Sequence, residues 1–132
     1  MRYLLDTAVW LWAQTRPERL GEKAGRLLSS IPAGDEVFLS AASSWEIGIK
    51  FYLGKLPLPE PPSVYVPSRL GGVRPLVVTH PHALAAGELP SYHRDPFYRL
   101  LIAQARLEEM TLLAADRIFA RYRVPVLWCD GR

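Results

Sequence analysis

The sequence is poor in cysteine and has no long hydrophobic run. Cys129 is the single cysteine among 132 residues, so an internal disulfide is excluded and an inert buried thiol is expected. No apolar run reaches the ~20 residues that cross a bilayer. The opening apolar segment is too short for a signal peptide, because Asp6 interrupts it. We therefore expect a soluble, cytoplasmic protein without a membrane partner.

Several common binding motifs are also missing. The chain has no P-loop lysine motif, no Gly-x-Gly-x-x-Gly and no Cys-x-x-Cys pair, so it offers no basis for P-loop nucleotide, dinucleotide or zinc chemistry. The histidines, His80, His82 and His93, lack a metal-ligand spacing and are expected at the surface or at helix caps.

The composition indicates one globular domain over residues 1–132. Hydrophobic residues make up 49% of the chain, enough for a substantial core. The net charge is +3 and 13 of the 16 basic residues are arginine, a side chain suited to phosphate contacts. This bias fits a nucleic-acid partner, but genomic composition or heat resistance would produce it equally well.

Short apolar runs alternate with helical patterns. The expected strands are 3–5, 37–39, 75–78, 111–113 and 124–128, the last at a sheet edge because it contains Pro125. The expected helices are 7–13, 20–31, 41–53, 64–70, 80–88, 96–109 and 117–122. Thr79 is expected to cap one helix, and Asp95-Pro96 is the strongest helix start. The alternation predicts an α/β fold, with a mainly parallel sheet covered on both faces.

Four acidic residues lie near the points where strands give way to helices: Asp6, Glu46, Asp95 and Asp116. The carboxyl ends of parallel strands meet at one edge of the sheet, so these side chains are expected to share a pocket. Crowded carboxylates repel one another unless a hard cation such as Mg²⁺ or Mn²⁺ neutralises them. Carboxylates that hold such ions can support hydrolysis of a phosphodiester.

Each acid also has an ordinary structural explanation. Asp6, Asp95 and Asp116 directly precede predicted helices and could cap them. Glu46 could form a capping box with Ser43 or pair with Lys50 one turn later.

Four segments in order carry a resemblance to a known family. They are 4–7 (Leu-Leu-Asp-Thr), 39–56 with Ser-Ser-Trp-Glu-Ile and Gly-Lys-Leu, 93–105 beginning His-Arg-Asp-Pro-Phe, and 116–128 ending Val-Pro-Val-Leu-Trp. Together they resemble PIN-domain proteins, and specifically VapC-type toxin ribonucleases. The resemblance implies a PIN-like α/β/α sandwich, a Mg²⁺ or Mn²⁺ site, endonucleolytic cutting of RNA, homodimerisation and neutralisation by a VapB-type antitoxin.

The sequence departs from the family pattern at Tyr98. The family usually has a second aspartate there, which joins the metal site, and a neutral phenol is a weaker ligand than a carboxylate. Ala8 and Ala114 are smaller departures from the same family pattern. Either Asp95 completes the site with Asp6, Glu46 and Asp116, or the chain is a weakened or silent PIN fold that binds an antitoxin or RNA.

Arginines flank the acidic positions. Arg94 and Arg99 surround the start of the helix at Pro96, and Arg117 and Arg121 follow Asp116, so all four are candidates for RNA phosphate contacts or for solvated helix faces.

Some aromatic residues could likewise contact RNA or have a structural role. Trp10, Trp12 and Tyr52 could stack on bases, although core or dimer-interface positions are commoner at helical spacing. A phosphoacceptor receiver-like domain is a third reading, but Asp6 stands alone and no lysine follows Lys55.

Overall fold

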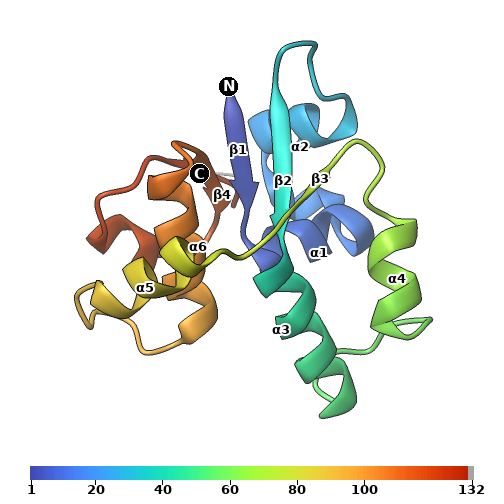
Figure 1. Cartoon of the computed structure of the whole chain (residues 1–132). Helices are drawn as coiled ribbons and strands as arrows, with labels where there is room; N and C mark the ends of the chain where they lie inside the picture. Colours follow the sequence, from blue (N-terminus) through green and yellow to red (C-terminus); the bar gives the residue numbers. More distant parts are fainter. Residues whose placement is uncertain (131–132) are drawn as a thin grey trace.

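A parallel sheet lies between two layers of helices in the structure, a computed structural model that describes residues 1–130 (Figure 1). The strands are β1 (Arg2–Leu5), β2 (Glu36–Ser40), β3 (Arg74–Leu76), β4 (Thr111–Ala114) and β5 (Val126–Trp128). The helices are α1 (Thr7–Thr15), α2 (Glu22–Ser29), α3 (Ala41–Tyr52), α4 (Pro62–Ser68), α5 (His80–Glu88) and α6 (Pro96–Leu107), with 3₁₀ turns η1 (Pro17–Leu20) and η2 (Arg117–Arg121). No helix within residues 1–130 is long and apolar enough to cross a membrane.

The five strands are all parallel and run in the order β3-β2-β1-β4-β5. The chain builds outward from β1 to β3 and then returns to β4 on the other side of β1. Ligand sites of open α/β sheets lie at such a switch point, outside the carboxyl ends of the strands. The order confirms the predicted parallel sheet, and it places β5 at an edge as Pro125 predicted.

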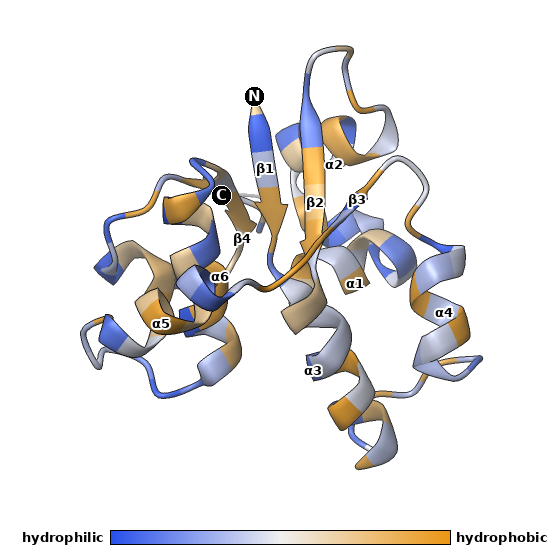
Figure 2. Ribbon diagram, in the orientation of Figure 1, coloured by the Kyte–Doolittle hydropathy of each residue, from blue (hydrophilic) through white to orange (hydrophobic). Residues whose placement is uncertain are grey.

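Successive strand residues are buried on opposite faces of the sheet. Leu5 and Leu113 are paired in register and face the helices α1, α2 and α4. Leu4 and Leu112 are the preceding pair and pack against α6 and η2. Because both faces are covered, the carboxyl-terminal parts of β1 and β2 are hydrophobic, as Figure 2 shows, while both strands begin with a charged residue.

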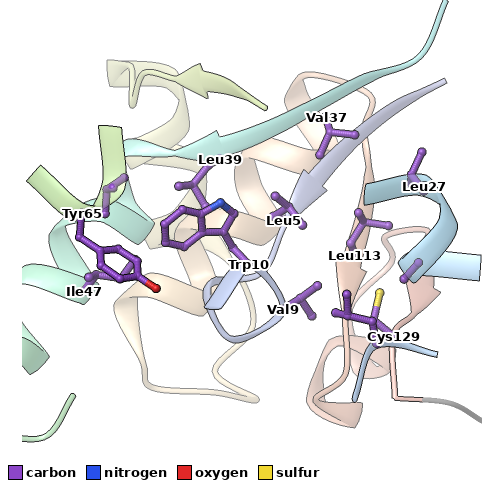
Figure 3. Packing of buried hydrophobic residues seen from close by; sticks show 13 residues of the cluster. Leu5, Val9, Trp10, Leu27, Val37, Leu39, Ile47, Tyr65, Leu113 and Cys129 are labelled. Carbon is purple, nitrogen blue, oxygen red and sulfur yellow. The ribbon is translucent and has the colours of Figure 1, made fainter. Parts of the chain in front are cut away.

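Trp10 is the largest side chain in the core on the α1 side. It is 1% exposed and meets Tyr65 of α4 edge-on, with ring centroids 6.0 Å apart (Figure 3). Leu5, Leu39 and Ile47 belong to the same cluster. Trp10 is therefore a core residue, which leaves it no role in stacking on RNA bases.

The helix starts predicted at Thr79 and Asp95 are confirmed. Thr79 and His82 form a capping box at α5, so His82 has a capping role as expected. Asp95 caps α6 by accepting a hydrogen bond from Phe97 N at 2.8 Å. The helix α6 ends at Leu107, slightly before the predicted end at 109, and Glu109 then adopts a positive φ of 54°.

The helix α3 turns an apolar face to solvent. Trp45 and Tyr52 are 64% and 74% exposed, and Ile49 and Leu53 lie on the same surface. The opposite side of α3 is buried and consists of Ala42, Ser43, Glu46 and Ile47. We refer to Trp45, Ile49, Tyr52 and Leu53 as the α3 face.

Candidate functional site

The site lies at the carboxyl ends of β1, β2 and β4. Asp6 directly follows β1, Glu46 lies in the second turn of α3 after β2, and Asp116 lies two residues beyond β4. A pocket of about 240 Å³ opens between α1, α3 and α6, beside Asp6 and Glu46. Its polar lining consists of Asp6, Thr7, Glu46, Lys50, Lys55 and Tyr98.

Asp6 and Glu46 are the buried carboxylates of this pocket, only 2% and 4% exposed. Asp6 Oδ1 and Glu46 Oε1 are buried and have no hydrogen-bond partner within residues 1–130. Burial, reinforced by the charges of Glu46 and Asp116, raises the pKa of Asp6 to about 7, although the backbone N–H of Thr7 and the charge of Lys50 oppose this. A bound proton or cation would relieve this unfavourable arrangement.

Two contacts hold the walls of the pocket. The Thr7 hydroxyl donates to Ser43 Oγ at 2.8 Å and links α1 to α3. The Lys50 ammonium lies 2.6 Å from Glu46 Oε2. Of the two structural roles foreseen for Glu46, the pairing with Lys50 is therefore confirmed. The capping box with Ser43 is not formed, because Ser40 caps α3.

Tyr98 connects the pocket to Asp116. Its hydroxyl donates to Asp116 Oδ2 at 3.2 Å, while Asp116 Oδ1 accepts from Ile118 N at 3.0 Å and begins η2. The ring packs edge-on against Phe119. Burial, followed by the charge of Asp6, holds the pKa of Tyr98 well above its usual value, so the phenol is a neutral donor beside the acids.

Asp95 is engaged at the start of α6. Its Oδ1 is used to cap α6, and the carboxylates that raise the pKa of Asp6 are Glu46 and Asp116. Within residues 1–130 no three His, Cys, Asp or Glu side chains converge closely enough to hold a metal ion together. The structure thus gathers Asp6 and Glu46, with Asp116 nearby, and the four-acid metal site stays a prediction.

Comparison with known families decides the classification. The family model of the PIN domain matches residues 3–125 of the chain. The chain belongs to the PIN-domain family. This PIN domain is also 54% identical over 50 residues to Ribonuclease VapC16 of Mycobacterium tuberculosis, a match that spans 36% of the chain and 36% of that relative. The chain therefore matches only about a third of the length of this curated relative.

Solved structures share the fold of this PIN domain at low sequence identity. VapBC2 from Rickettsia felis, bound to a promoter DNA fragment, has a TM-score of 0.76 at 17% identity and covers 98% of this chain and 100% of its own. A toxin–antitoxin complex from Klebsiella pneumoniae has a TM-score of 0.63 at 16% identity, with 95% of each chain covered. FitAcB from Neisseria gonorrhoeae has a TM-score of 0.61 at 23% identity, with 95% and 96% covered. The predicted α/β/α sandwich is confirmed, and the receiver-like reading falls away.

The candidate RNA-binding arginines differ in what they contact. Arg99 donates to four backbone carbonyl oxygens within residues 87–93, at 2.9–3.3 Å, and so clamps the loop before α6. Arg117 lies 2.8 Å from Asp130 and stacks on Trp128, and Arg121 stacks on Tyr92. Arg94 is exposed. RNA contact by these arginines stays a prediction, and the internal contacts of Arg99 favour a structural role.

The single cysteine of this PIN domain is part of the core. Cys129 is fully buried, and burial raises the pKa of its thiol to about 12. The thiol is therefore un-ionised near neutral pH, and the expectation of an inert buried cysteine is confirmed.

The two lysines that line the pocket are not among the site residues predicted from the sequence. Lys50 was assigned only a pairing role with Glu46, and Lys55 none, yet both line the pocket. For Lys50 the available signal is its position one turn after Glu46 on the same helix. Lys55 lies beyond that helix, after Gly54, so helical spacing could not place it.

Proposed function

We propose that this PIN domain is a divalent-metal-dependent endoribonuclease and the toxin component of a VapBC-type toxin–antitoxin system. The observation that carries the proposal is the pair of buried carboxylates, Asp6 and Glu46, each with one oxygen that has no partner in the described part of the chain. Likeness to a protein named as a ribonuclease supports RNA as the substrate.

The residues present fit a hard cation. Asp6 and Glu46 would hold Mg²⁺ or Mn²⁺ through their unpaired oxygens, and Mg²⁺ commonly uses one or two protein carboxylates and keeps several waters. When bound, such an ion polarises a phosphodiester and activates water as a nucleophile. Asp116 adds negative charge nearby, and Tyr98 holds its carboxylate in place.

The side chains around the acids have defined tasks in this proposal. Lys50 fixes the Glu46 carboxylate through Oε2, which leaves Oε1 for the ion. The Thr7–Ser43 hydrogen bond keeps the first turns of α1 and α3 at a constant separation, so Asp6 and Glu46 stay opposed. Preorganised ligands of this kind need little rearrangement on binding.

RNA cleavage by the purified chain tests the proposal. With Mn²⁺ and a single-stranded RNA we expect internal cleavage that stops in EDTA, and calorimetry should detect Mn²⁺ binding to the protein alone. The absence of both cleavage and Mn²⁺ binding would reject the proposal.

Tyr98 favours a second candidate function. Because this phenol occupies the position at which the family usually has an aspartate and engages Asp116, the chain could instead be a catalytically weakened or silent PIN fold that binds an antitoxin or RNA. This candidate predicts Mn²⁺ binding that is weak and cleavage that is absent.

We also propose a VapB-type antitoxin as partner, a homodimer as the assembly and the cytoplasm as the place of action. The structural neighbours include a toxin–antitoxin complex, which supports the antitoxin. The α3 face supports the dimer, because exposed apolar clusters mark protein interfaces and a single helix can pack against its own copy about a twofold axis.

Replacing Tyr52 by glutamate tests the dimer. In a twofold interface the two copies of Tyr52→Glu would place two like charges close together, so we expect the dissociation constant to rise by at least ~100-fold. Light scattering coupled to gel filtration would report the shift to monomer. Leu84→Glu is the matched control, since Leu84 is 68% exposed on α5, away from the α3 face. A dimer that persists with Tyr52→Glu would place the interface elsewhere.

A further inference from the structure

The candidate pocket contains two of the three lysines of the chain. Lys50 belongs to the last turn of α3 and its side chain is 50% exposed, although its ammonium contacts Glu46. Lys55 is exposed and lines the same pocket. The third lysine, Lys23, is exposed on α2 and lines a different pocket.

The turn after α3 places both lysines at the same pocket. Gly54 adopts a positive φ of 73°, which reverses the chain direction, and Lys55 N then donates to Lys50 O at 2.8 Å. Lys55 therefore folds back over the last turn of the helix that carries Glu46 and Lys50.

Capping of α3 does not account for these lysines. Basic side chains often stabilise a helix carboxyl terminus by satisfying its free carbonyls. Here backbone N–H groups already satisfy three of the last carbonyls, from Leu53 to Ile49, from Gly54 to Phe51 and from Lys55 to Lys50. The carboxyl terminus of α3 therefore does not need the lysine ammonium groups for capping.

Charge explains which ligand the two lysines would bind. A phosphodiester is an anion, so Asp6 and Glu46 repel it as it approaches. Cations beside the acids reduce this repulsion and hold the phosphate near them. The Lys50 contact with Glu46 occupies one of its three N–H donors, which leaves the others for phosphate oxygens.

We propose that Lys50 and Lys55 form a phosphate-binding site that positions the RNA backbone beside Asp6 and Glu46. This phosphate site rests on the proposed ribonuclease function, to which it adds the residues that bind the RNA backbone. Lys50 and Lys55 are positioning residues, because they act on a phosphate group while the acids hold the ion.

Salt dependence of RNA binding tests this site without cleavage. A labelled single-stranded RNA is titrated with the full chain in EDTA over a series of salt concentrations, followed by fluorescence anisotropy. Each lost phosphate contact reduces the slope of log K against log salt by about 0.7 for a single strand. We expect this reduction for Lys50→Met and for Lys55→Met, and no change for Lys23→Met. Lys50→Arg keeps the charge and should retain the slope.

The outcomes separate this site from the function itself. Unchanged slopes for Lys50→Met and Lys55→Met overturn the phosphate site, while cleavage by the unsubstituted chain in Mn²⁺ would leave the nuclease intact. An equal reduction for Lys23→Met also overturns it, because the effect would then be one of net charge. Failure of the unsubstituted chain to bind RNA in EDTA also overturns the phosphate site, while the nuclease proposal is still decided by cleavage and Mn²⁺ binding. Lys55→Met keeps the test decisive if Lys50→Met impairs folding, since Lys55 is exposed.

Discussion

Replacing Asp6 by asparagine is expected to abolish metal-dependent RNA cleavage and, at the same time, to stabilise the metal-free protein above pH 7. Asparagine keeps the size of the side chain but removes the charge that would hold the ion, so cleavage in Mn²⁺ should fall by at least ~100-fold. The gain in stability arises because the buried Asp6 carboxylate is unfavourable when ionised.

The direction of this effect follows from proton linkage. The Asp6 carboxyl has a pKa of about 7 in the folded protein and 3.8 without the protein environment. Between these values the folded state binds more protons than the unfolded state, so the free energy of unfolding falls as pH rises from about 4 to 7 and stays low above that. At 1.36 kcal/mol per pH unit, this loss is at most about 4 kcal/mol.

Thermal unfolding in EDTA at pH 5 and pH 8 measures the change. Asp6→Asn should have a higher Tm than the unsubstituted protein at pH 8 and a smaller difference at pH 5. Adding Mn²⁺ should raise the Tm of the unsubstituted protein only, because ligands stabilise the state that binds them. Glu18→Gln, at an exposed acid in η1, is the control and should leave each Tm unchanged. Cleavage that survives Asp6→Asn, or a lower Tm at pH 8, would contradict this account.

Replacing Tyr98 by aspartate is expected to strengthen metal binding about 10- to 100-fold and to increase RNA cleavage. The phenol now donates to Asp116 and lies near enough to Asp6 and Glu46 for their charges to raise its pKa. A carboxylate at this position adds a third charge for the ion, worth roughly 1–3 kcal/mol for a partly exposed group. Calorimetric titration with Mn²⁺ and the initial rate of RNA cleavage measure the two effects.

Tyr98→Phe is the matched control for this substitution. Phenylalanine keeps the edge-on packing against Phe119 but removes the hydrogen bond to Asp116, so it separates loss of the phenol from gain of a charge. We expect Mn²⁺ affinity to change less than threefold, because no carboxylate is added. If the unsubstituted protein cleaves RNA as fast as Tyr98→Asp does, Tyr98 has not weakened the site. If only Tyr98→Asp cleaves, the silent PIN fold is the correct reading.

Metal-free Tyr98→Asp should also be less stable than the unsubstituted protein. Burial and the charges of Glu46 and Asp116 already raise the pKa of Asp6. A further carboxylate beside Asp6 increases the repulsion between the ionised acids above pH 7. Mn²⁺ should reverse this loss of stability.

The sequence by itself determined the order and type of most elements. Hydrophobic runs with polar or helical segments between them predicted the strands and helices, and Thr79 and Asp95-Pro96 marked helix starts that the structure retains. These features depend on hydrogen bonds and side-chain spacing within a few residues, so they can be read locally. The edge position of β5 was also predictable, because Pro125 limits strand pairing.

Only the tertiary structure decided which residues share the site. Asp95 and Asp116 both cap helical segments, yet of these two only the charge of Asp116 raises the pKa of Asp6. The tertiary structure also leaves the α3 face exposed to solvent and places Lys55 in the lining of the pocket. These outcomes depend on how each element is rotated and placed against others far along the chain. Spacing along one helix cannot specify that rotation, because it identifies an apolar face without identifying what will cover it.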